Sequence, residues 1–160
     1  MTLYARFDTT LGPMYATAEG DALTGIYFEG ARWAPALDAQ WREAPDHPVL
    51  RDCARQLHDY FAGTREAFDL PLAIHGTAFQ ANVWREIAAI PFGQTVTYAA
   101  LAQRAGSDAA VRAAGAATGR NPFTIVVPCH RVVGSGGALT GYAGGLERKR
   151  SLLALERAAR

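Results

Sequence analysis

Residues 94–120 read QTVTYAALAQRAGSDAAVRAAGAATGR and contain two short helical segments in close succession. The first helix is predicted over residues 98–105, and Gly106 ends it because glycine readily adopts the left-handed backbone that follows a helix. Ser107 is placed to cap the second helix, which we expect to run to about Thr118. Two short helices joined by a glycine-containing turn predict a helix-turn-helix.

The next stretch, residues 121–133, reads NPFTIVVPCHRVV and places a histidine directly after a cysteine. Ile125–Val127 is predicted to form a buried strand that leads through a proline to Cys129. A thiol must ionise to act as a nucleophile, and a nearby imidazole can take its proton directly or through a water molecule. A Cys-His pair is common enough for purely structural reasons, so this pair alone defines only a candidate site.

The last helix is predicted from Leu146 to about Ala158, and it contains an acidic residue, Glu156, near its end. At about 100° per residue, Glu156 falls between Leu152 and Leu153 and so shares their buried face. A buried carboxylate needs a partner, and an imidazole base needs a carboxylate to fix its tautomer. Two interpretations stay open on spacing alone: Glu156 pairs with His130, or it is a surface residue near a fraying helix end.

Upstream of the two short helices, Thr77 to Gln80 forms a capping box for a helix whose apolar face ends before Pro91.

The first half of the chain is predicted to contain mostly strands. Three strands are expected at Leu3–Phe7, Met14–Ala18 and Leu23–Phe28. They are followed by a loop over residues 31–48, a helix from about Leu50 to Phe61 with Cys53 on its apolar stripe, and a possible strand at Phe68–Leu72. His75-Gly76 marks a boundary. The sequence thus predicts an α+β protein with an N-terminal scaffold domain, residues 1–75, and a helix-turn-helix domain, residues 76–160.

Composition narrows the class of protein. Apolar residues make up 49% of the 160 residues, enough for a packed core. Residues 1–75 carry a net charge of −5 and residues 76–160 one of +6, so the second half is suited to an anionic partner. Two cysteines without metal-ligand spacing argue against a disulfide scaffold and a structural zinc site. Neither a membrane-spanning run nor a signal peptide is evident, so we expect a cytoplasmic protein.

The second half of the chain resembles the O(6)-alkylguanine-DNA alkyltransferase family, also called methylated-DNA–protein-cysteine methyltransferases. The similarity covers about half the chain in the right order and spacing, and Pro-Cys-His-Arg-Val with the downstream Gly-Tyr-x-Gly-Gly is its specific part. The matching residues are Gly76-Thr77-x-Phe79-Gln80-x-x-Val83-Trp84, Ile90-Pro91-Phe92-Gly93-x-Thr95-x-x-Tyr98, Arg112-Ala113-x-Gly115, Asn121-Pro122, Pro128-Cys129-His130-Arg131-Val132, Gly141-Tyr142-x-Gly144-Gly145-Leu146, Lys149 and Leu152-Leu153-x-x-Glu156. The resemblance implies a ribonuclease-H-like fold for the N-terminal sheet and helix.

The resemblance also implies a role for individual residues. Cys129 is then the alkyl acceptor, His130 the base and Glu156 its partner. Asn121 links the helix-turn-helix to the active-site strand, and Tyr98 helps to turn the nucleotide out and then serves the bound guanine. Arg112 is implied to enter the duplex where the base leaves. The implied DNA contacts are Arg112, Ala113, Thr95, Thr118 and Arg120. The implied guanine pocket consists of Val132, Tyr142, Ala143 and Lys149.

The implied activity is the stoichiometric, irreversible transfer of a methyl or larger alkyl group from O(6)-alkylguanine, and from O(4)-alkylthymine, to Cys129. The implied partner is double-stranded DNA containing alkylated guanine, bound by a monomer without a cofactor. Some family members bind zinc in the N-terminal half, but their Cys and His ligands are not evident here, so we expect no metal. The second short helix is rich in Ala and Gly and lacks the side chains that read bases, which fits a slim helix in the minor groove.

Three other functions remain to be separated from this one. A lesion-binding relative would lack the acceptor cysteine, whereas Cys129 is present. A sequence-specific regulator would need a second helix with base-reading side chains. A Cys-His-Glu hydrolase would turn over an ester or amide and would need an oxyanion hole, for which the sequence shows no sign.

Overall fold

The computed structural model describes residues 1–106 and 108–158. The chain divides into two compact units, an N-terminal unit (Met1–Ile74) and a C-terminal unit (His75–Arg160). The predicted cap at Ser107 lies outside the described residues. The predicted α+β class is confirmed, with a largely antiparallel sheet in the first unit and a mostly helical second unit.

The N-terminal unit is built on a four-stranded sheet with the order β3-β2-β1-β4. The three predicted strands are confirmed as β1 (Leu3–Thr9), β2 (Gly12–Glu19) and β3 (Ala22–Phe28), which pair antiparallel in sequence order. The fourth strand, β4 (Arg42–Glu43), pairs parallel with β1 inside the predicted loop. Two residues carry no alternating pattern, so the sequence could not reveal β4.

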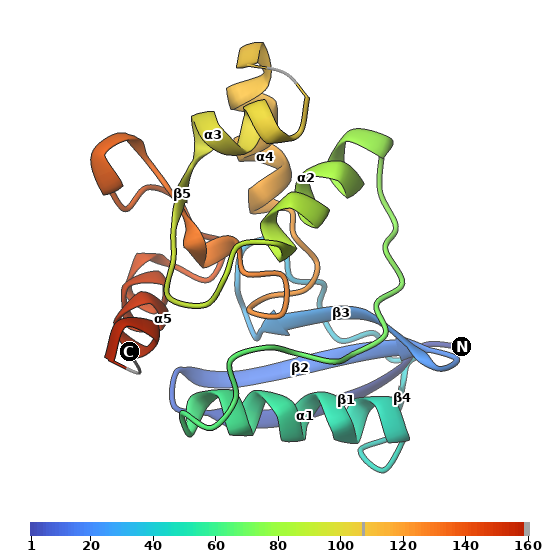
Figure 1. Ribbon diagram of the computed structural model, residues 1–160. Helices are drawn as coiled ribbons and strands as arrows, with labels where there is room; N and C mark the ends of the chain where they lie inside the picture. The colour runs from blue at the N-terminus through green and yellow to red at the C-terminus, as the bar shows by residue number, and fades with distance from the viewer. Residues whose placement is uncertain (107, 159–160) are drawn as a thin grey trace. The chain divides into compact units, whose positions relative to one another are not determined.

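One helix, α1 (Pro48–Phe61), packs on this sheet, as Figure 1 shows. Proline at its first position costs the helix nothing, because the first backbone N–H groups have no partner inside a helix. Its buried face contains Leu50, Cys53 and Leu57, which confirms the predicted apolar stripe and the predicted burial of the Cys53 thiol. Burial raises the pKa of Cys53 to about 12, so this thiol stays protonated.

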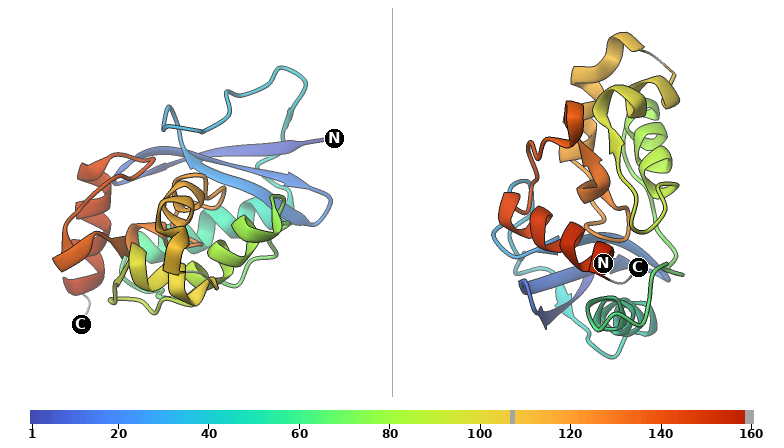
Figure 2. Two further views of the ribbon diagram at one scale, coloured as in Figure 1. Left: turned by 90° about the horizontal axis from the view of Figure 1, so that it is seen from above. Right: turned by 60° about the vertical axis from the view of Figure 1, so that its left-hand side comes forward.

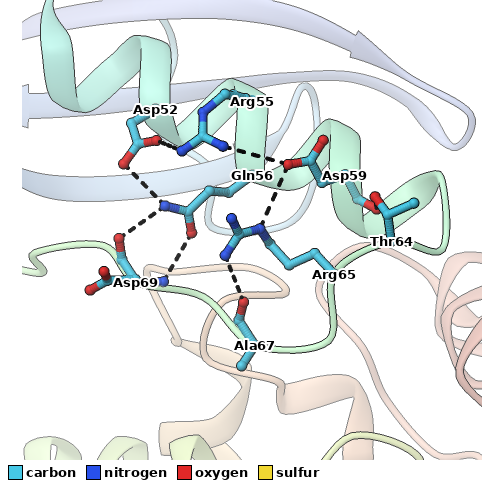
Figure 3. A network of polar contacts seen from close by, with 8 residues as sticks. All are labelled: Asp52, Arg55, Gln56, Asp59, Thr64, Arg65, Ala67 and Asp69. Carbon is cyan, nitrogen blue, oxygen red and sulfur yellow. Dashed lines mark hydrogen bonds and ion pairs between the residues drawn. The ribbon is translucent and has the colours of Figure 1, made fainter.

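The strand expected at Phe68–Leu72 does not form, apart from a single bridge between Leu23 and Leu72. The reason lies in a buried glutamine of α1, drawn in Figure 3. The side-chain amide of Gln56 donates to the carbonyl of Asp69 at 3.0 Å and accepts from its N–H at 2.9 Å. Both backbone groups of Asp69 are thereby used by a side chain, so they are not available to a neighbouring strand.

The C-terminal unit is mostly helical and has short connecting elements. Its elements, in chain order, are α2 (Ala78–Ala88), β5 (Val96–Thr97), α3 (Tyr98–Arg104), η1 (Asp108–Ala110), α4 (Val111–Gly119), η2 (Cys129–Arg131), β6 (Val132–Val133), η3 (Ser135–Gly137) and α5 (Leu146–Ala158). The predicted capping box of Thr77 and Gln80 is present at the start of α2. The last helix was predicted with its observed bounds, and none of the helices described is long and apolar enough to cross a membrane.

The predicted helix-turn-helix is formed by α3 and α4, which lie next to each other in Figures 1 and 2. Helix α2 packs against both, and the indole N–H of Trp84 donates to the carbonyl of Ala117 at 2.8 Å. Helix α4 begins later than predicted, because η1, a turn of 3₁₀ helix, precedes it and Ala110 provides no side-chain cap. The small residues of α4 let α2 and α3 approach it closely.

The buried strand predicted at Ile125–Val127 was wrong. These residues make a tight turn, with one bridge between Thr124 and Val127 and a left-handed backbone at Ile125, whose φ is 72°. The only regular pairing in this part of the described chain joins β5 to β6 in parallel, with Val96 opposite Val132. This two-residue pairing was not predicted either. It fixes Tyr98, just after β5, relative to η2, just before β6.

Candidate active site

Cys129 is the first residue of η2 and is buried, with 7% of its surface exposed. Its position is set by Asn121, whose amide donates to the carbonyl of Val127 at 2.7 Å and accepts from the N–H of Phe123 at 2.9 Å. Asn121 therefore joins the end of α4 to the turn that leads into Cys129. Burial raises the pKa of the Cys129 thiol, and the side chain of Asn121 and the charge of Lys149 act in the opposite direction.

His130 is completely buried, and its Nε2 lies 2.7 Å from Oε2 of Glu156. Glu156 itself is 1% exposed on the inner face of α5, as the helical spacing predicted. An ionised carboxylate only accepts hydrogen bonds, so this contact places the ring proton on Nε2 and leaves the lone pair on Nδ1. Nδ1 is buried and has no hydrogen-bond partner among the described residues. The basic nitrogen is thus unused by the protein.

Arg131 completes this cluster, and the sequence interpretation gave it no role. Its Nε and Nη2 donate to the two oxygens of Glu156 at 2.8 and 2.9 Å, and Nη1 donates to the carbonyl of Ile90 at 2.7 Å. The residue is only 5% exposed. Arginine is mostly a surface residue, and the sequence offered one weak signal for its burial: Arg131 stands between the Cys-His pair and two buried valines.

Lys149 is fully buried, which the helical spacing indicated by placing it on the face of Glu156. Its Nζ donates to the carbonyls of Thr140 and Gly141 at 2.9 and 3.2 Å and lies 5.8 Å from the centre of the Tyr98 ring. Lys149 therefore connects α5 with the segment that carries Tyr142 and Ala143, two of the predicted pocket residues. Burial lowers the pKa of Lys149, whereas the nearby Cys129 raises it.

Tyr98 opens α3, and burial raises the pKa of its phenol, so the hydroxyl keeps its proton at neutral pH. Among the other predicted pocket residues, Val132 is buried in β6, whereas Tyr142 and Ala143 are half-buried. Lys149 lies over the Tyr98 ring, and Cys129 is close enough to both residues to influence their pKa.

The predicted DNA contacts are mostly on the surface. Arg112 and Ala113 are exposed in the first turn of α4, Arg120 is exposed at its end, and Thr95 is exposed just before β5. Thr118 is the exception, because it is 5% exposed and its hydroxyl donates to the carbonyl of Ala114 at 2.7 Å. The side chain of Thr118 is therefore buried in this structure, and its role as a DNA contact stays a prediction.

Within the described residues, no three His, Cys, Asp or Glu side chains lie close enough together to hold a metal ion. The site is therefore built from a buried Cys-His-Glu arrangement and a helix-turn-helix with an exposed arginine in its second helix. These features define a DNA-binding protein that carries a candidate thiol nucleophile.

Two domains of one known protein family match this chain. The DNA binding domain of 6-O-methylguanine DNA methyltransferase matches residues 78–158, and the ribonuclease-like domain of the same family matches residues 2–74. The chain belongs to the 6-O-methylguanine DNA methyltransferase family.

Individual relatives are similar to this chain over almost its whole length. The methylated-DNA–protein-cysteine methyltransferase of Mycobacterium tuberculosis is 41% identical over 157 residues, covering 98% of this chain and 93% of the relative. The constitutive enzyme of Bacillus subtilis is 42% identical over 159 residues, covering 98% and 96%. A crystal structure of Mycobacterium tuberculosis OGT in complex with DNA is similar, with a TM-score of 0.89, 39% identity and coverage of 98% and 94% of the two chains.

Proposed function

We propose that this chain repairs DNA by moving an alkyl group from the O6 atom of guanine to the sulfur of Cys129. The observation that carries the proposal is the buried contact of 2.7 Å between His130 and Glu156. Cys129 directly precedes His130 in the sequence. The relatives are named methylated-DNA–protein-cysteine methyltransferases, and the DNA binding domain of the family spans the site.

The chemistry follows from the donors present. A water molecule bound at Nδ1 of His130 carries the proton of Cys129 to the imidazole, and Glu156 stabilises the resulting imidazolium. The thiolate then attacks the alkyl carbon in line, so the S–C bond forms as the C–O6 bond breaks. Guanine leaves with the electron pair, and the protonated hydroxyl of Tyr98 donates a hydrogen bond to its ring. The departing guanine then takes up the proton that His130 received, so that His130 is neutral again. The product is a thioether, which ordinary cellular reductants do not cleave, so each molecule acts once.

The nucleotide must leave the base stack to reach a buried sulfur. We assign Arg112 to the gap that the nucleotide leaves, with Ala113 on the same slim helix in the minor groove. Arg120 and Thr95 are assigned to the DNA backbone. The turned-out base is assigned to Val132, Tyr142, Ala143 and Lys149, a pocket that also admits O(4)-alkylthymine. We also propose that the protein acts as a monomer in the cytoplasm.

Intact-mass spectrometry tests the proposal directly. Incubation with a duplex containing O(6)-methylguanine is expected to add one methyl group per molecule, and peptide mapping is expected to place it on Cys129. Cys53 serves as the internal control, because its buried thiol stays protonated. Repeated turnover by one molecule, or a methyl group on Cys53, would rule out the mechanism. Turnover of an ester without a mass increase would identify a hydrolase instead.

Arg112→Ala separates the turning-out of the base from the chemistry. The guanidinium is exposed on α4, so its loss leaves the Cys129 cluster intact. Repair of duplex DNA is expected to fall by roughly one to two orders of magnitude, since extrusion of a base costs a few kcal/mol. The reaction with free O(6)-benzylguanine, which needs no extrusion, is expected to keep its rate. Single-turnover rates on both substrates provide the measurement.

Arg120→Ala is the matched control, because this arginine is also exposed but lies at the other end of α4. As a phosphate contact it is expected to weaken binding modestly and to reduce the salt slope by about one unit. If Arg112→Ala slows both substrates equally, Arg112 supports the fold of the site and has no role in extrusion.

A further inference from the structure

The carboxylate of Glu156 is shared between two cationic partners of different kinds. Its Oε2 lies 2.7 Å from Nε2 of His130 and 2.9 Å from Nη2 of Arg131, while Oε1 accepts from Nε of Arg131 at 2.8 Å. The backbone N–H of Gly93 also donates to Oε1, at 3.5 Å. The imidazole can gain and lose a proton near neutral pH, whereas a guanidinium keeps its charge at every physiological pH.

Two further contacts hold Arg131 at this carboxylate. Its third nitrogen, Nη1, donates to the carbonyl of Ile90 at 2.7 Å, and its Cζ lies 5.6 Å from the centre of the Phe92 ring. A two-point contact between a guanidinium and a carboxylate also fixes the plane of the carboxylate. Arg131 therefore orients the oxygen that receives the N–H of His130.

The fixed charge matters because a buried carboxylate that faced only an imidazole would favour the imidazolium. Such a preformed ion pair has no lone pair left and cannot accept a proton from a thiol. We propose that Arg131 is a positioning residue that neutralises Glu156 and thereby keeps His130 uncharged, ready to take the proton of Cys129. This inference rests on the proposed function, because it assigns a task to the base of that reaction.

The charges around His130 support this assignment. The ionisable groups that face it are Glu156 and Lys149 from α5, and Cys129 and Arg131 from η2, with Tyr98 of α3 next to Cys129. Glu156 is one anion beside two cations, so a proton taken from solvent would place a third positive charge in a buried cluster. A proton that moves from Cys129 to His130 leaves the total charge unchanged.

The cluster therefore disfavours uptake of a proton from solvent but tolerates its internal transfer. Burial lowers the pKa of His130, Glu156 raises it, and the charges of Arg131 and Lys149 lower it further. The acid-side midpoint of the reaction rate is then expected below about pH 6.5, the ordinary pKa of a histidine. The site is expected to stay active in mildly acidic solution.

Arg131→Met tests this role by removing the charge while keeping an unbranched side chain. Single-turnover alkylation by free O(6)-benzylguanine is measured between about pH 5.5 and pH 8.5, a range that brackets the ordinary pKa of histidine. The variant is expected to have its acid-side midpoint raised by about one pH unit, so that it loses roughly threefold more rate at pH 6 than at pH 8. Loss by the same factor at every pH would mean a purely structural role and would overturn the inference.

Arg150→Met is the matched control, since Arg150 is an exposed arginine of α5, and its pH profile is expected to equal that of the wild type. Arg131→Lys keeps the charge and is expected to restore the wild-type midpoint at a reduced rate. Failure of this lysine variant to restore the midpoint counts against the inference.

A measurement of the protonation state of His130 in the wild-type protein tests the inference even if Arg131→Met does not fold. Nitrogen NMR of labelled histidine is expected to show His130 neutral at about pH 6, whereas the imidazolium at neutral pH would overturn the inference. Failure of the wild type to react at all would refute the proposed function. Normal wild-type alkylation with a protonated resting His130 would refute only the role of Arg131.

Discussion

Cys129→Ser is expected to abolish alkyl transfer while leaving the affinity for duplex DNA nearly unchanged. The hydroxyl is far less acidic than the thiol, so His130 cannot generate the anion that attacks the alkyl carbon. The DNA-facing residues Arg112 and Arg120 lie on α4 and are not altered. A gel-shift titration with alkylated duplex gives the affinity, and intact mass gives the transfer.

Cys53→Ala provides the control for the loss of a cysteine. This thiol is completely buried in α1 and stays protonated, so the variant is expected to keep full transfer and to lose stability by about 1–2 kcal/mol. Methyl transfer by Cys129→Ser, or loss of transfer in Cys53→Ala at normal folding, would contradict the assignment of the acceptor.

Glu156→Gln is expected to reduce both the rate of transfer and the stability of the protein. The amide cannot stabilise an imidazolium as a carboxylate does, so the rate is expected to fall on the order of a hundredfold or more. The substitution also leaves the buried guanidinium of Arg131 without its anion. Breaking a buried ion pair in this way costs about 3–5 kcal/mol. Single-turnover kinetics and urea unfolding measure the two effects separately.

Glu147→Gln is the matched control, because Glu147 is an exposed acid in the first turn of the same helix. Its loss is expected to cost about 0.3–1 kcal/mol through the helix dipole and to leave the rate unchanged. A folded Glu156→Gln that reacts at the wild-type rate would remove Glu156 from the relay, whatever its contribution to stability.

Regular elements with a strong period were predicted well from the sequence. The spacing of apolar residues located α1 and α5, and the same spacing placed Glu156 and Lys149 on the inner face of α5. The strands of the N-terminal sheet followed from alternation and turn residues. These features depend on neighbours in the sequence, which is why they can be read without a structure.

Features set by side chains from distant elements were not predicted. The backbone of Asp69 is captured by Gln56, thirteen residues away, and this capture prevents a strand that the local sequence favours. The burial of Arg131 likewise depends on Glu156, which lies 25 positions later.

The left-handed turn at Ile125 has a consequence for how this position can vary. A branched side chain in this conformation costs roughly 1–2 kcal/mol, yet burying an isoleucine gains about 1.5–3 kcal/mol, and Ile125 is only 1% exposed. The two effects nearly cancel, so stability alone places little selection on the residue. Glycine would relax the backbone but would lose the anchor that keeps the turn closed. The turn before the nucleophile is therefore held by a side chain against its own backbone preference, and sequence drift at position 125 is expected to alter the placement of Cys129 before it alters the melting temperature.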